Sequence, residues 1–179
     1  MVDLAARRRE APPERTREAV MRVLDEVLDP EVPVLSVVEL GIVRDVEITA
    51  EAVTVVVTPT YSGCPAIKVI EDDIRAALRA HGHADARVRT TFAPAWTTDW
   101  IGEEAKAKLR AYGIAPPRRT SAADGELVQL LRRREPEPAA CPFCSSVRTT
   151  LRSEFGSTAC KAMHYCDECC QPFEEFKAI

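Results

Sequence analysis

The sequence predicts an α+β protein in which a small mixed three-stranded sheet packs with helices and is followed by a small cysteine-rich unit. Three observations lead to this prediction. Two neighbouring stretches, 42–48 and 52–58, are rich in valine and isoleucine and are typical of paired strands. A helical pattern and a third strand-like stretch, 86–92, come after them. Six of the seven cysteines then fall after residue 140.

The composition is that of a soluble globular protein. The 179 residues are 46% hydrophobic and 29% charged, and the net charge of -4 gives no reason to expect nucleic acid as a partner. No apolar run approaches the roughly 20 residues that a membrane span needs. No apolar segment follows the N-terminal arginines, so we expect no secretory signal and a reducing, cytoplasmic location. Clustered cysteines there indicate metal binding rather than disulfides.

The first elements follow in chain order. Residues 1–14 are rich in Ala, Arg and Pro and are expected to be a disordered tail. Apolar residues at helical spacing from Val20 to Leu28 predict a helix. This helix is expected to stop at Asp29-Pro30, because proline disfavours helical geometry in the residue before it. Asp29-Pro30-Glu31 is then an extended loop that carries two carboxylates, and a short turn or helix at 35–40 is closed by Gly41.

The predicted sheet is built around its second strand. Residues 42–48 and 52–58 are expected to form a hairpin. Val53 to Val57 includes no charged residue, so this strand is predicted to be central, with both faces largely covered. The helix after it is expected to begin at Pro65 and to end near Gly82. The stretch 86–92 is placed beside the central strand through a right-handed crossover.

Cys64 is the strongest candidate for reactive chemistry, because it lies between the central strand and the following helix. A thiol there faces the positive end of the helix dipole, which favours the thiolate that attacks electrophiles or binds soft metals. The alternative is a small buried hydrophobe with no chemical role. An enzyme that used Cys64 as a nucleophile would need a nearby base, and His81 and His83 lie at the far end of the helix.

Trp96 and Trp100 are the only tryptophans in the chain. They flank a helix start in which Thr98 or Asp99 can act as the cap. Both rings are expected to pack in the core, with a contact surface beside the Cys64 turn as the alternative. The helix is expected to reach Tyr112-Gly113, and its buried face consists of Ile101, Ala105, Leu109 and Tyr112.

These elements divide the chain into four segments. The tail, 1–14, precedes a domain at 15–114. Residues 115–140 have prolines near both ends and are expected to be a linker, in which only 126–132 has helical character. The cysteine-rich unit occupies 141–179.

Cys141-Pro142-Phe143-Cys144 and Cys166-Asp167-Glu168-Cys169 are two Cys-x-x-Cys pairs separated by 21 residues. Two such turns complete a tetrahedral four-thiolate shell of the kind that zinc accepts, as in a zinc ribbon. A unit of about 40 residues cannot build a sufficient core, so bound metal is expected to stabilise it. Such a site is normally structural, but the same four sulfurs could hold iron or an iron–sulfur cluster. Three further residues are surplus candidate ligands: Cys160, His164 and Cys170.

Several blocks of this sequence resemble the PaaD family of phenylacetate-degradation proteins, which belongs to the SufT-like group of iron–sulfur assembly proteins. These blocks are Asp29–Glu31, Ser36–Val43, Thr58–Pro65, Pro94–Ile101 and Phe155–Ala162, together with the four-cysteine ribbon. The likeness extends from about residue 16 to the end of the chain. Cys170, where such a ribbon more usually has glycine, is its chief departure.

The resemblance implies a cytoplasmic, non-enzymatic accessory protein with an iron–sulfur assembly domain and a structural zinc site. Cys64 is implied to handle iron or a cluster transiently, with Asp29, Glu31 and Thr60 beside it. The implied client is the iron–sulfur reductase component of the phenylacetyl-CoA epoxidase, and other iron–sulfur assembly proteins are further expected partners. A scaffold role in the epoxidase complex and an enzyme that depends on Cys64 are the alternatives. Pairing of an exposed edge strand across a two-fold axis would give a homodimer.

Overall fold

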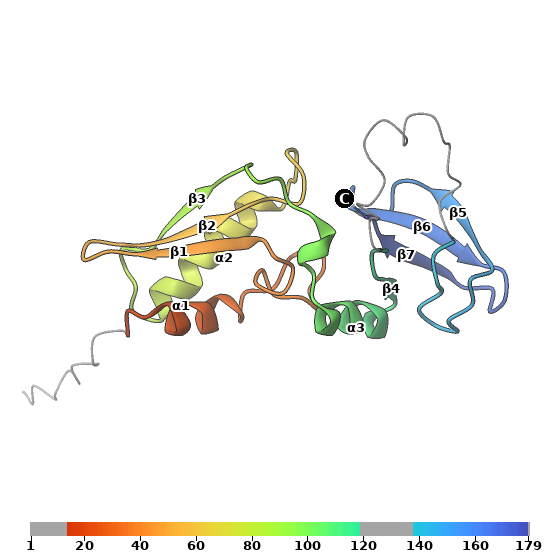
Figure 1. The fold of residues 1–179 in the computed structure, drawn as a ribbon, viewed down its shortest axis with the longest axis horizontal. Coiled ribbons are helices and arrows are strands. Elements are labelled where there is room, and N and C mark those ends of the chain that lie inside the picture. The colour runs from red at the N-terminus through yellow and green to blue at the C-terminus, as the bar shows by residue number, and fades with distance from the viewer. Residues whose placement is uncertain (1–13, 119–137, 179) are drawn as a thin grey trace, which may run out of the picture.

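The structure is a computed structural model that describes residues 14–118 and 138–178 (Figure 1). The first part of the chain contains α1 (Arg17–Leu24), β1 (Val43–Ile48), β2 (Val53–Val57), α2 (Ile67–Ala80) and β3 (Arg87–Thr90). After β3, the chain forms the 3₁₀ helix η1 (Thr98–Trp100), α3 (Glu103–Tyr112), β4 (Ile114–Ala115), β5 (Thr149–Ser153), β6 (Lys161–Cys166) and β7 (Pro172–Phe176). No helix in these ranges is long and apolar enough to cross a membrane.

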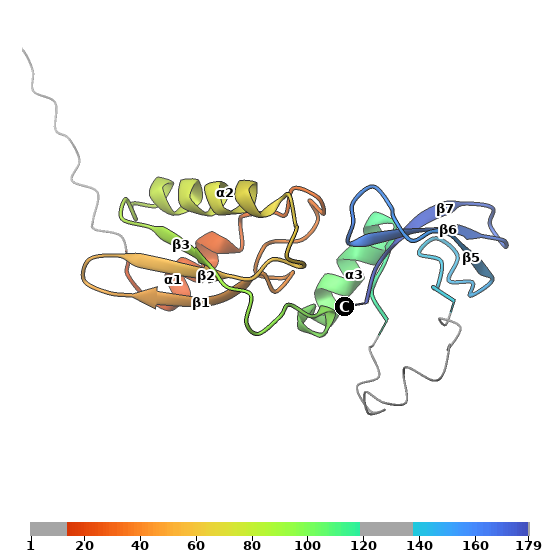
Figure 2. The same ribbon diagram turned by 90° about the horizontal axis from the view of Figure 1, so that it is seen from above.

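The first sheet confirms the predicted α+β class and the mixed three-stranded arrangement. Its strand order is β1-β2-β3, so β2 is central as expected. β1 and β2 form an antiparallel hairpin, and β3 runs parallel to β2. Val53, Val55 and Val57 are fully buried, because β2 is covered by strands at both edges and by the helices beside the sheet (Figure 2).

Two helix boundaries differ from prediction. α1 ends at Leu24 instead of Leu28, because the chain then turns so that Leu28 bridges Ser36 and the Asp29 carboxylate takes over local N–H groups. α2 begins at Ile67 rather than Pro65. Pro65 and Ala66 instead form a turn in which the Ile67 N–H donates to the Cys64 carbonyl at 3.4 Å.

The tryptophan segment is not one continuous helix. Thr97 caps η1, the chain extends at Ile101, and α3 begins only at Glu103. Trp96, just before η1, fixes this segment against the core, since its buried indole N–H donates to the Leu40 carbonyl at 3.0 Å. The core-packing prediction is confirmed for Trp96. The guanidinium of Arg44, by contrast, lies over the ring of the half-buried Trp100, at 3.4 Å from its centroid.

The predicted buried face of this helix is wrong for one residue. Ala105 and Leu109, four residues apart, face the core, but Tyr112 is exposed. Tyr112 occupies the last turn, where the chain leaves the helix through Gly113 in the left-handed conformation, with φ at 92°.

The second sheet has the order β4-β7-β6-β5. β5, β6 and β7 are antiparallel neighbours. Ala115, expected to open a linker, instead lies in β4 and pairs in parallel with β7. Ile114 and Ala115 are apolar and buried, so this sheet edge gives them a better environment than solvent. The predicted helix at 126–132 and most of the N-terminal tail lie outside the described residues.

The C-terminal sheet, which we call the ribbon (β5–β7 with its cysteine turns), is docked onto the first part of the chain. Phe176 at the end of β7 is 0% exposed and shares one hydrophobic core with α1, α2 and the first sheet. Its ring centroid lies 6.0 Å from that of Trp96. Figures 1 and 2 both place the end of β7 at the junction between the two sheets. Burial of one such ring contributes on the order of 3–5 kcal/mol.

Candidate functional site

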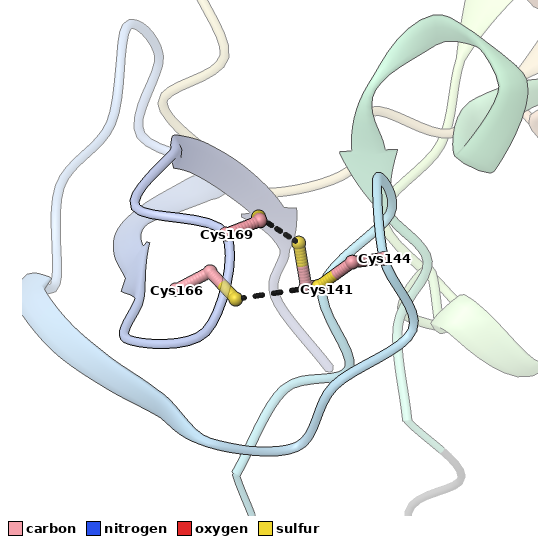
Figure 3. Close-up of side chains that lie close together, drawn as sticks. All are labelled: Cys141, Cys144, Cys166 and Cys169. Carbon is pink, nitrogen blue, oxygen red and sulfur yellow. Dashed lines mark hydrogen bonds between the residues drawn. The ribbon is translucent and has the colours of Figure 1, made fainter.

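The two Cys-x-x-Cys turns bring four sulfurs together (Figure 3). The Sγ atoms of Cys141, Cys144, Cys166 and Cys169 all lie within 4.8 Å of one another. Cys141 Sγ is 3.7 Å from Cys169 Sγ, and Cys144 Sγ is 3.5 Å from Cys166 Sγ. A tetrahedral ion with bonds of about 2.3 Å to sulfur implies sulfur–sulfur separations of roughly 3.8 Å. The four side chains therefore fit a metal site of the zinc type.

Both cysteine turns end in a left-handed residue. Ser145 and Cys170, with φ of 61° and 58°, are the only non-glycine residues with positive φ in the described parts of the chain. The Cys170 N–H donates to the Cys166 carbonyl at 2.9 Å, which closes the second turn. This conformation is the one that glycine adopts most easily, so the structure explains why Cys170 is an unusual residue at this position.

The surplus candidate ligands lie outside the four-sulfur group. Cys170 is exposed on its turn. His164 in β6 is buried, with its Nε2 2.8 Å from Glu175 Oε2, and the same carboxylate accepts two N–H groups of Arg118. Cys160 lies just before β6, at the junction with the first part of the chain, and is described below.

Two of the four thiols, Cys166 and Cys169, have pKa values that are shifted in opposite directions. The backbone N–H groups of Cys169 and Glu168 lower the pKa of Cys166 to about 7, despite its burial. Burial raises the pKa of Cys169 to about 12, and the neighbouring thiols add to this effect. A metal ion must therefore displace protons from this group, and its binding strengthens as pH rises.

A second site is centred on Cys64. The turn after β2 and the loop after α1 place Cys64, Thr60, Asp29 and Glu31 around one small cavity of about 10 Å³. Asp29 is buried, and its Oδ1 accepts the N–H groups of Glu31 and Val32, each at 2.8 Å. The structure thus brings together all four residues that we associated with iron handling from the sequence.

Cys160 belongs to the same cavity, although nothing in its sequence position connects it with Cys64. Cys160 Sγ lies 3.1 Å from Thr158 Oγ1 and 3.8 Å from Glu31 Oε2. Next to it, the ammonium group of buried Lys161 is 3.4 Å from the Glu31 carbonyl oxygen. The only available sequence signal was the block 155–162, with its resemblance to PaaD.

The cavity does not favour the free Cys64 thiolate, contrary to our expectation from the helix dipole. Burial raises the pKa of this thiol; the N–H groups of Ala66 and Ile67 oppose the rise, while the charges of Glu31 and Asp29 add to it. Cys64 is only 9% exposed, so desolvation outweighs the helix terminus. Burial likewise raises the pKa values of Asp29, Glu31 and Cys160. A cation in the cavity would reverse this preference for the protonated forms.

Histidine does not contribute to this cavity, as far as residues 14–118 and 138–178 show. Cys64 precedes the first turn of α2, and His81 caps its last turn. A helix of 14 residues separates them by about 21 Å. His83 is buried beyond that end. Neither ring is positioned to take a proton from Cys64, which disfavours nucleophilic catalysis.

Comparison with known proteins covers nearly the whole chain. Residues 17–90 match the family "Iron-sulfur cluster assembly protein", and residues 128–177 match the "PaaD zinc beta ribbon domain". A protein of Escherichia coli, named as a putative subunit of 1,2-phenylacetyl-CoA epoxidase, is 44% identical over 160 residues, which are 89% of this chain and 92% of that protein.

Two shorter proteins are similar to part of the chain. An "Fe-S protein maturation auxiliary factor" of Porphyromonas gingivalis is 37% identical over 97 residues, which are 53% of this chain and 91% of that protein. A solved structure of a conserved hypothetical protein from Thermotoga maritima is 33% identical, covers 55% of this chain and 98% of its own, and superposes with a TM-score of 0.48.

Proposed function

The chain belongs to the PaaD family, and from this premise we propose that it is a cytoplasmic, non-enzymatic maturation factor that handles iron for an iron–sulfur protein. Cys64 is the transient ligand of the cargo, which is iron or an iron–sulfur cluster. The proposed domain at 15–114 supplies Cys64, Asp29 and Glu31, and zinc is the resident metal of the ribbon unit at 141–179. The segment 115–140 leads from one to the other, although Ala115 itself pairs with β7.

The observation that carries the proposal is the ligand set around Cys64. The Cys64 sulfur and two carboxylate groups, from Asp29 and Glu31, line a single cavity beside the surface turn at Ser62 and Gly63. Sulfur and carboxylate ligands together suit iron. A carrier must also release its cargo, and this mixed set binds more weakly than the closed four-sulfur group of the ribbon.

The client that we propose is the iron–sulfur reductase component of the phenylacetyl-CoA epoxidase. The relative named as a putative part of that enzyme supports the epoxidase as the setting, and the maturation factor from Porphyromonas gingivalis supports the iron–sulfur chemistry. The reductase is the component whose resident cluster requires assembly. Other iron–sulfur assembly proteins are the proposed source of the iron.

Elemental analysis of anaerobically purified protein tests the carrier function. We expect one zinc per chain in the wild type and in Cys64→Ser, but iron only in the wild type. Cys170→Ser is the matched control, because it removes an exposed thiol that belongs to neither the four-sulfur group nor the Cys64 cavity. We also expect the client reductase to lack its cluster when matured with Cys64→Ser. A client with its full cluster content in that variant would refute the carrier function.

The name of the Escherichia coli relative also favours a second candidate, a scaffold component of the epoxidase complex. In that case Cys64→Ser would assemble with the complex and support full client activity. Loss of the ribbon metal would then prevent assembly. Client activity and cluster content with Cys64→Ser, measured beside assembly by size-exclusion chromatography, separate the two functions.

A further inference from the structure

We propose that Cys160 of the ribbon is the second sulfur ligand at the Cys64 site, and that the site closed by the ribbon holds one metal ion rather than a cluster. This inference rests on the proposed function of Cys64 as an iron ligand. It adds a ligand from a different sheet and limits the cargo that the docked form can carry.

The first argument is the position of the two thiols. Cys64 comes from the turn after β2, Cys160 comes from the ribbon, and both line the same cavity with Glu31 between the two segments. Cys160 is 4% exposed and its sulfur lies 3.8 Å from Glu31 Oε2. Two sulfurs and one carboxylate form a donor set that suits ferrous iron and neighbouring divalent metals.

The second argument is that Cys160 is held in place by neighbouring polar groups, one of which is a buried lysine. Thr158 contacts its sulfur, and the adjacent Lys161 is 4% exposed. The Lys161 ammonium lies 3.1 Å from Glu174 Oε2 and 3.4 Å from the Glu31 carbonyl oxygen, so it links the ribbon to the carboxylate loop. A buried lysine is costly unless it is paired, and here its charge also offsets the carboxylates of the cavity.

The third argument concerns size. The space between these side chains is about 10 Å³, which is close to the volume that one water molecule requires. A single ion fits this space. Even the smallest iron–sulfur cluster adds a second iron and two bridging sulfides. A cluster would therefore require Cys160 and Phe176 to move away from Cys64, which means that the ribbon must undock.

Cobalt(II) provides an optical test with the full chain. The ribbon is first loaded with zinc, which Co²⁺ does not displace because zinc binds such sites more tightly. We expect the wild type to take up one further Co²⁺, with near-ultraviolet charge-transfer absorption from two thiolates. Cys160→Ser should lose about half of this absorption. It should also bind Co²⁺ at least about tenfold more weakly, since even residues that only hydrogen-bond to a metal ligand change affinity about 10–100-fold. Cys64→Ser should show neither the high affinity nor the full absorption, and the control Cys170→Ser should match the wild type.

The outcomes separate this inference from the proposed function. If Cys64→Ser loses the ion while Cys160→Ser matches the wild type, Cys160 is not a ligand but the Cys64 site stands. If Cys64→Ser also matches the wild type, the proposed function fails with the inference.

Iron-edge X-ray absorption of the iron-loaded wild type gives a second measurement that does not depend on whether the variants fold. Two sulfur neighbours and no second iron support the proposal. One sulfur neighbour, or a second iron at short distance, overturns it.

Discussion

Phe176→Ala should open the cavity without unfolding the protein. The side chain of Phe176, the last residue of β7, is 0% exposed and packs against Trp96. An aromatic side chain buries at least about 150 Å² of surface, which at about 25 cal/mol per Å² is roughly 4 kcal/mol. Measured truncations of buried phenylalanine cost about 3–5 kcal/mol. Because this ring joins the ribbon to the first part of the chain, we expect most of that loss to weaken docking.

Site-specific alkylation of the metal-free cavity measures this opening. Cys160 and Cys64 are 4% and 9% exposed, so iodoacetamide reaches Cys160 mainly when the ribbon undocks. A loss of about 3 kcal/mol increases the open population about 100-fold, and the alkylation rate of Cys160 should rise in proportion. Mass spectrometry of the digested protein assigns the label to each cysteine. Zinc protects the four ribbon cysteines in the same sample.

Phe155→Ala is the matched control. Phe155 lies on the same ribbon but is 68% exposed, so its removal should leave the rate of Cys160 unchanged. The reasoning would be refuted if Phe176→Ala retained its zinc and its helical circular dichroism while Cys160 reacted less than about tenfold faster. Loss of the circular dichroism signal would instead show that Phe176 stabilises the first domain rather than docking.

Three further predictions concern the ribbon. Cys144→Ser, or removal of the ribbon metal by a chelator, should unfold 138–178 and leave the first sheet intact. Cys64 should then become accessible to alkylation. A ribbon that stays ordered by NMR after complete metal removal would contradict this prediction. Cys170→Gly should raise the free energy of unfolding of the ribbon by about 0.5–1 kcal/mol in denaturant titrations at constant zinc, because it removes a left-handed cysteine. The pKa of Glu174 in the folded protein is lowered: burial would raise it, but the Ser157 N–H and the Lys161 ammonium outweigh burial. The Glu174 carboxylate therefore stabilises the fold above about pH 4.5, and this stabilisation is lost as the pH falls through the lower pKa of the folded state. Glu174→Gln should therefore flatten the acid side of a stability–pH curve.

The features that the sequence predicted correctly are local. Two residues between paired cysteines allow both sulfurs of each pair to reach one ion, so the spacing alone indicated the four-cysteine group. An uncharged run from Val53 to Val57 was sufficient to predict a central strand. In each case the neighbours along the chain determine the structure.

The features that the sequence did not predict depend on contacts between distant residues. Cys160 and Cys64 are 96 positions apart, and no periodicity relates them. Trp96 is fixed against the core by a hydrogen bond to Leu40, across 56 positions. The prediction that the Cys64 thiolate is favoured was wrong for the same reason. Burial and the carboxylates of the 29–31 loop raise the pKa of this thiol more than the local helix terminus lowers it.

The short strand β4 has a consequence for how quickly cargo could leave. Ala105 and Leu109 anchor α3 in the first core, and Gly113 alone separates α3 from β4, which pairs with β7 in the ribbon. The ribbon therefore cannot swing away as a freely hinged lid. Its release requires Phe176 to leave the shared core and the β4–β7 ladder to part, and both are local unfolding events. The dwell time of an ion behind Cys160 would then be set by the frequency of these openings, and a partner that competes for the β7 edge would shorten it.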